Sequence, residues 1–173
     1  MNHEFTFSDA VKARAVEFSD ANARVDSETK DPDNQARNKA ASALAEIAAK
    51  RAYDKIDGYE AELTDGFDVE AGDEEDYDLR LQTPDGDVVR IDVKARISDD
   101  GGDSANLMPG GYIERRPASL FDAYVQVWVR PDLKRAEVVG FATREYFQSE
   151  SEFFFGCHEN RLLKKNLKPL DSA

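Results

Sequence analysis

Apolar and polar residues alternate strictly in the middle of the chain. In VVRIDVKAR, residues 88–96, every second position is apolar from Val89 onward, and residues 77–83 follow the same rule. Successive side chains of a β-strand point to opposite faces, so this pattern predicts two strands, each with one apolar and one polar face. The Pro-Asp-Gly sequence between them predicts a tight turn and therefore a hairpin.

The hairpin register follows from the requirement that both apolar sets lie on one face. A two-residue turn would place Leu79 opposite Asp92 and break that condition. A three-residue loop at residues 84–86 satisfies it, with Leu79 opposite Ile91 and the loop glycine in a left-handed conformation. In this register Asp78 is expected to lie directly opposite Asp92.

Two opposed carboxylates need a compensating charge. Opposed residues of an antiparallel pair have Cβ atoms about 4.5–5.5 Å apart, and like charges at that distance are destabilising. Magnesium prefers hard oxygen ligands and is commonly held by one or two carboxylates together with water or phosphate. Lys94 lies on the same face as Asp92, about 6.6 Å further along the strand. The alternative is chance, because 36 of the 173 residues are acidic and Asp-x-Lys is a short pattern.

Other patterns predict the remaining elements. Ala-rich or amphipathic spacing predicts helices at residues 10–24 and 35–56 and a short helix at 144–148. Alternation predicts strands at residues 123–130 and 137–142, with short extended pieces at 62–68 and 111–114. The tail, residues 153–173, predicts a strand and a basic segment, RLLKKNLK. The order predicts a single mixed α/β (α+β) domain over residues 1–173, with an N-terminal helix in 1–30 and a core in 35–147 around a mixed, mostly antiparallel sheet.

These residues together resemble the PD-(D/E)XK nuclease superfamily. Its pattern pairs an acid on one strand with Asp/Glu-x-Lys on the next, matched here by Asp78 and by Asp92-Val93-Lys94, although Tyr77 stands where the signature has proline. The segment NKAASALAEIAAKRAYDKI is similar to the preceding helix of that family, and DAYVQVWV with EVVGFATREYF resembles its later strand and helix. The resemblance covers about residues 35–147 and implies a restriction-endonuclease-like α/β/α fold.

The resemblance also implies an activity, the hydrolysis of DNA phosphodiester bonds with Mg²⁺ or Mn²⁺. By position, Asp78, Asp92 and the Val93 carbonyl would bind the metal, and Lys94 would orient or deprotonate the attacking water and stabilise negative charge. Glu46 in the helix would hold a second metal or a bridging water.

Each further candidate residue has a plain structural alternative. Glu46 is also placed to form an i,i+4 pair with Lys50 on the helix surface. Contacts to DNA would come from basic residues, each of which is equally interpretable as a solvated charge, and from one glutamine that would otherwise fill a polar position of the sheet. These residues are Arg90, Arg96, Arg115, Arg116 and Gln126, and the basic tail segment RLLKKNLK is a further candidate for phosphate contacts.

The charge of the chain indicates more about the conditions in which the protein works than about the ligand that it binds. The net charge is −13, but residues 1–78 hold nine basic against 21 acidic residues, whereas residues 79–173 hold 14 against 15. The acidic first half and the low lysine content resemble proteins of salt-loving organisms, in which concentrated salt screens self-repulsion; an ordinary acidic protein is the other interpretation. The single cysteine, the absence of an apolar 18-residue run and the polar start predict a cytoplasmic protein without a membrane partner.

Three functions remain open from the sequence. The first is a metal-dependent nuclease acting on DNA, as a monomer or as a homodimer that cuts both strands. The second is a catalytically inactive nuclease-like binding protein or viral accessory protein. The third is a Holliday-junction resolvase, which would act as a symmetric dimer.

Overall fold

The computed structural model describes residues 3–23, 32–64, 77–99, 106–109, 121–154 and 159–170. The helices are α1 (Asp9–Ala23), α2 (Pro32–Tyr53) and α4 (Arg144–Glu150), with a 3-10 helix η1 (Lys164–Asn166) near the end of the chain. The strands are β1 (His3–Thr6), β2 (Glu60–Leu63), β3 (Leu79–Gln82), β4 (Val88–Ile97), β5 (Asn106–Pro109), β6 (Ala123–Val129), β7 (Arg135–Thr143), β8 (Glu152–Phe154) and β9 (Glu159–Leu162).

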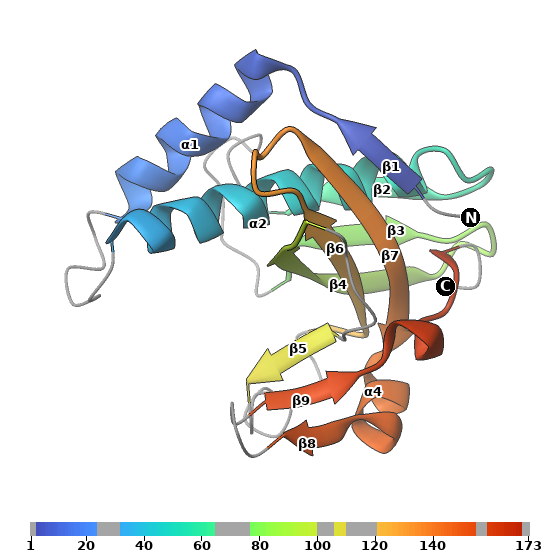
Figure 1. Cartoon of the computed structure of the whole chain (residues 1–173). Helices are drawn as coiled ribbons and strands as arrows, with labels where there is room; N and C mark the ends of the chain where they lie inside the picture. The colour runs from blue at the N-terminus through green and yellow to red at the C-terminus, as the bar shows by residue number, and fades with distance from the viewer. Residues whose placement is uncertain are drawn as a thin grey trace.

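Six of these strands form one mixed sheet, in the order β1-β7-β6-β4-β3-β2. Neighbouring strands are antiparallel except for β4 and β6, which are parallel. A separate three-stranded antiparallel sheet has the order β5-β9-β8 (Figure 1). The protein is therefore a mixed α+β structure with a six-stranded mixed, mostly antiparallel sheet, as the sequence predicts.

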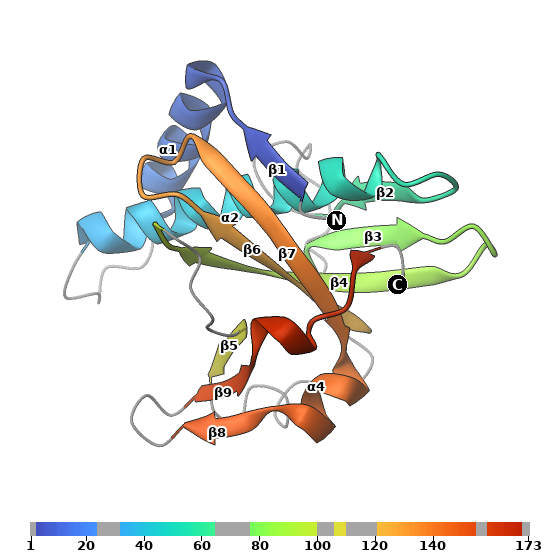
Figure 2. The same cartoon turned by 45° about the vertical axis from the view of Figure 1, so that its right-hand side comes forward.

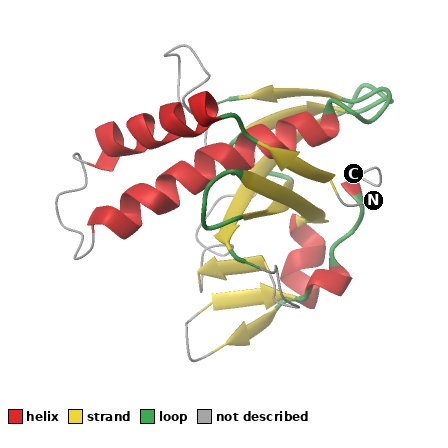
Figure 3. Ribbon diagram, turned by 45° about the horizontal axis from the view of Figure 1, so that its top comes forward, coloured by secondary structure: helices red, strands yellow, loops and turns green. Residues whose placement is uncertain are grey.

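Helix α2 covers one face of the six-stranded sheet, and α1 packs along α2. The two helices lie side by side (Figure 3), and the apolar stripe of α2, including Leu44 and Ala48, is fully buried with Ile91 and Val125 of the sheet. The predicted helix stripe and the predicted apolar face of the strands thus meet in one core. Burial of this apolar area is the main force that holds the helices on the sheet.

Different elements pack against the opposite face of the six-stranded sheet. Figures 1 and 2 show the small sheet and α4 on the side away from the two long helices. Tyr124 of β6 packs there in a second apolar cluster with Phe147 of α4 and Leu162 of β9. The α/β/α expectation holds for the helical side, whereas this second side combines a short helix with a small sheet.

The hairpin forms in the predicted register. Leu79 pairs with Ile91 and Leu81 pairs with Val89. The Thr83 N–H donates to the Asp87 carbonyl at 2.9 Å, which closes a three-residue loop, and Gly86 has φ +89°. Gly suits this left-handed position because it has no Cβ.

Most element boundaries agree with the prediction within a few residues, and two differences are informative. Strand β1 is missing from the prediction, because four residues carry too little alternation; it forms by pairing with β7. The predicted extended piece at residues 111–114 lies outside the described residues, whereas β5 forms just before it by pairing with β9. None of the described helices has the length and apolar character needed to cross a bilayer.

Candidate active site

Asp78 directly precedes the first residue of β3, at the point where β4 continues beyond β3 and is paired only with β6. The backbone ladder stops at the Leu79–Ile91 pair, and the Asp78 N–H donates to the Ile91 carbonyl at 3.0 Å. The Asp78 side chain then replaces the missing strand, because its Oδ2 accepts a hydrogen bond of 2.6 Å from the Val93 N–H. The carboxylate is therefore fixed beside the peptide bond that joins Asp92 to Val93, although Asp78 is not paired directly with Asp92 as the register argument expected.

Asp92 is one of three buried polar residues in the described part of the chain, with 3% of its surface exposed. Its Oδ2 lies 2.5 Å from the Lys94 Nζ, and the side chains are 5% and 24% exposed, respectively. No described group meets Oδ2 in good hydrogen-bond geometry, so the contact with Lys94 is an ion pair rather than a well-aligned hydrogen bond. A buried charge needs such a partner, because desolvation is costly.

The parallel strand β6 supplies the neighbours of this pair. Tyr124 is the register partner of Asp92, and Gln126 is the partner of Lys94. Gln126 is 2% exposed, and its Nε2 donates to the Lys94 carbonyl at 3.0 Å, whereas its Oε1 has no hydrogen-bond partner among the described residues. The predicted Gln126 thus lies next to the Asp-x-Lys strand, where it fixes the backbone at Lys94.

Glu46 is the member of the predicted site that lies on a helix. It lies half-buried on α2, the helix that covers the face bearing Ile91. Across the described ranges, no three His, Cys, Asp or Glu side chains are grouped so that they could hold a metal ion. Glu46 is therefore not assembled with Asp78 and Asp92 into a three-carboxylate centre.

The remaining donor set still fits one hard cation. Two carboxylates flank the Asp92–Val93 peptide, and all available donors are oxygen atoms, as Mg²⁺ prefers. The buried Asp92 Oδ2 faces the Lys94 ammonium at 2.5 Å without an aligned hydrogen bond, so a cation bound there would have to displace that ammonium from the oxygen. Mg²⁺ usually completes its octahedron with water and substrate phosphate, so two protein carboxylates suffice.

The predicted basic residues are in different situations. Arg90 forms a bidentate pair with Asp122, with Nε–Oδ2 at 2.9 Å and Nη2–Oδ1 at 2.7 Å, and the Arg90 N–H also donates to Asp122 Oδ2. These hydrogen bonds lower the pKa of Asp122 and raise the pKa of Arg90. A phosphate at Arg90 would have to compete with Asp122. Arg115 and Arg116 lie outside the described residues.

Arg96 occupies a different place from Arg90. It is half-buried on β4 and is the register partner of Trp128 on β6. Asp92, Lys94 and Arg96 therefore follow one another along the same face of one strand.

The sequence interpretation missed two features of this region. Asp122 directly precedes β6 and binds Arg90 of the neighbouring strand β4, a contact that the sequence patterns do not predict. Lys164 belongs to the predicted basic tail, and the structure places its Nζ 4.5 Å from the centre of the Trp128 ring. Both contacts join residues far apart in the chain, so no local signal marks them.

Comparison with known proteins adds no family assignment: no family model matches the chain, and no curated protein gives a significant match.

Proposed function

We propose that this protein is a metal-dependent nuclease that hydrolyses phosphodiester bonds of DNA. The observation that carries the proposal is the convergence of Asp78, Asp92 and Lys94 on one peptide of strand β4. A restriction-endonuclease-like fold is part of the proposal. It is supported by the order of α2, the β3–β4 hairpin and the parallel strand β6 beside the Asp-x-Lys strand.

Each residue of the candidate site would have its own role in the proposed reaction. Asp78 and Asp92, with the Val93 carbonyl, would hold one Mg²⁺ or Mn²⁺ ion, which supplies Lewis-acid activation of the phosphate and a lower pKa for bound water. The Val93 N–H holds the Asp78 carboxylate in position. Lys94 places its ammonium at the Asp92 carboxylate and is near enough to neutralise charge that develops on a phosphate there.

A plasmid cleavage assay tests the proposal. Supercoiled plasmid is incubated with Mg²⁺, Mn²⁺ or Ca²⁺ across a salt series, using wild type and the variants Asp78→Asn, Asp92→Ala and Lys94→Ala. We expect nicking with Mg²⁺ or Mn²⁺ and a loss of at least about 100-fold in each variant, because each removes a group at the reacting centre. Asp85→Asn is the matched control, since Asp85 is an exposed acid in the turn of the same hairpin.

The outcomes of this assay are distinct. Circular dichroism and melting curves establish that each variant is folded. Cleavage that persists in a folded Asp92→Ala variant, or no cleavage of supercoiled, linear, single-stranded and four-way-junction DNA by the wild type with any of these metals, would refute the nuclease proposal.

One observation favours a second candidate, a nuclease-like binding protein without catalysis. The Lys94 ammonium already neutralises Asp92, so the buried charge is compensated in the protein itself. In that case Mg²⁺ would leave the melting temperature unchanged. A metal-dependent rise in the melting temperature that Asp92→Ala abolishes would favour the nuclease instead.

A further inference from the structure

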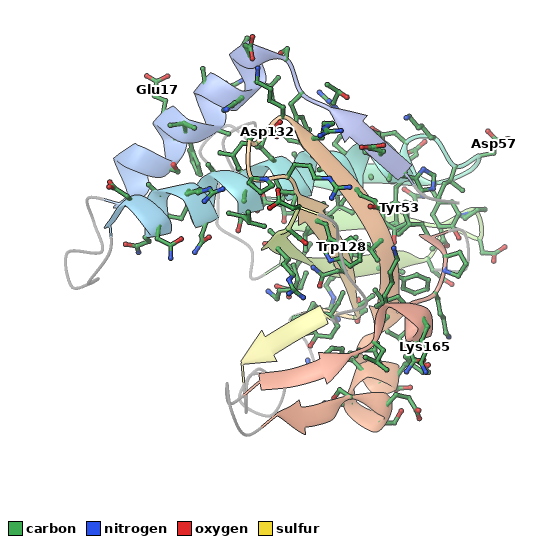
Figure 4. The ribbon with its side chains drawn as sticks, in the orientation of Figure 1. Glu17, Tyr53, Asp57, Trp128, Asp132 and Lys165 are labelled. Carbon is green, nitrogen blue, oxygen red and sulfur yellow. The ribbon has the colours of Figure 1, made fainter. Side chains whose placement is uncertain are left out.

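A second cationic feature lies on the same side of the sheet, near the end of the chain. The residues that line it are two lysines and three apolar residues, around an open hollow of about 620 Å³: Val139, Leu163, Lys164, Lys165 and Leu167. We refer to it as the Lys164–Lys165 hollow. Figure 4 labels Lys165 at the C-terminal segment and Trp128 on the central strands. Among the described residues, the lining contains no acidic side chain, in a chain whose net charge is −13.

Lys164 is held in place without being neutralised by a close ion pair. Its Nζ lies over the Trp128 ring at 4.5 Å and 3.7 Å from Glu137 Oε1. Glu137 shares its charge with Arg130, whose Nη2 lies 3.8 Å from Oε2. Both N···O separations are longer than a normal hydrogen bond, so the Glu137 carboxylate pairs only loosely with Lys164 and Arg130. Lys165 is the third cation of this group of four residues. The local charge of this group is therefore positive by two.

The strand register relates this hollow to the candidate active site. Trp128, under Lys164, is the partner of Arg96, four residues beyond Asp92 on the same strand face. Four residues of a strand span about 13 Å. Successive phosphates on one DNA strand advance about 3.4 Å along the helix axis. For a DNA strand that runs along β4, the span from Asp92 to the Trp128–Lys164 contact therefore corresponds to about four nucleotides.

We infer that the Lys164–Lys165 hollow binds the DNA backbone about four nucleotides from the phosphate that is cut. The inference rests on the proposed nuclease function and extends it to the placement of the substrate. The ligand is a phosphodiester, which the two ammonium groups attract, and the apolar wall offers contact to the sugar. Leu163 is suited to this because 42% of its surface is exposed.

The test separates binding from cleavage. Fluorescence anisotropy measures the affinity for a 20-base-pair duplex in Ca²⁺ across a salt series, with Lys164→Gln/Lys165→Gln beside wild type. We expect about tenfold weaker binding, and a slope of log affinity against log salt that is smaller by about one to two. Where the protein cleaves, KM rises and kcat is unchanged, because contacts remote from the cut contribute uniform binding.

The matched control removes the same charge elsewhere. Lys50→Gln/Lys55→Gln changes two lysines of the α2 region, one paired with Asp54 and one lying over the Phe5 ring. This variant should keep the wild-type affinity and salt slope. An equal loss in both double variants would indicate general charge rather than a site, and would overturn the inference.

A second substrate series locates the contact. In a duplex whose cut position has been mapped, single phosphates are replaced by neutral methylphosphonates. Replacement three to five nucleotides from the cut should weaken binding of the wild type but not of Lys164→Gln/Lys165→Gln, since the two changes remove the same interaction. If the wild type cuts DNA and Lys164→Gln/Lys165→Gln binds and cuts DNA equally well, the inference about the hollow is wrong and the proposed function stands. Wild type that neither binds nor cuts DNA overturns the proposed function as well.

Discussion

The ion pair between Lys94 and Asp92 offers the sharpest test of the site, through the substitution Lys94→Met. Methionine keeps much of the apolar stem and removes the ammonium, which leaves a carboxylate that is 5% exposed without its cation. Removing one partner of a buried pair costs about 3–5 kcal/mol. Because the Lys94 side chain is 24% exposed, water can reach the pair, and we expect the lower end, about 3 kcal/mol.

The loss should be visible in thermal and urea unfolding. For a chain of this size, each kcal/mol shifts the melting temperature by about 2–4 °C, so the expected decrease is about 6–12 °C. The double variant Asp92→Asn/Lys94→Met should recover most of it, because no buried charge remains. Together with the single variant Asp92→Asn, these proteins complete a double-mutant cycle that isolates the coupling between the two side chains.

Magnesium distinguishes a metal site from a purely structural pair. A ligand that binds only the folded state adds about 2.7 kcal/mol of stability at 100 times its Kd. Lys94→Met removes the competing ammonium and keeps both carboxylates, so Mg²⁺ should restore more stability to this variant than to wild type, and none to the double variant. The measurement is urea unfolding with and without Mg²⁺ at matched ionic strength.

Two results would refute this reasoning. A melting temperature for Lys94→Met within about 2 °C of wild type would mean that the pair contributes little. An equal effect of Mg²⁺ on all three proteins would mean that Asp92 does not bind the ion.

Two further predictions concern the support of the site. Gly140→Ala should destabilise the protein by about 1–3 kcal/mol and expose the C-terminal tail to protease. The reason is that Gly140 has φ +154° and an added Cβ would lie 2.7 Å from the Lys168 carbonyl oxygen. Unchanged unfolding stability together with unchanged proteolysis would contradict this prediction. Asp122→Asn should cost about 0.2–1 kcal/mol at neutral pH through the lost pair with Arg90. Because the pKa of Asp122 is lowered from 3.8 in the folded state, this contribution is complete above pH 3.8 and disappears as the pH falls through the lower folded-state pKa. The difference between the urea midpoints of variant and wild type should therefore shrink as the pH is lowered below 3.8.

The sequence alone determined the elements whose causes are local. Alternation with period two defined both faces of β4, and the requirement that Leu79 and Ile91 share a face fixed the hairpin register before any coordinates. The same reasoning placed Lys94 beside Asp92, because residues two apart on a strand must share a face. Alanine content and 3.6-residue periodicity located α2.

The tertiary structure decided what depends on contacts between distant segments. Only the fold shows that β3 begins at Leu79, so that the Asp78 carboxylate binds the Val93 N–H instead of facing Asp92 across the ladder. It alone places Lys164 over Trp128 and Asp122 against Arg90. The physical reason is that strand order and side-chain partners are selected by the packing of the whole core, whereas periodicity reports only which face a residue shares with its near neighbours.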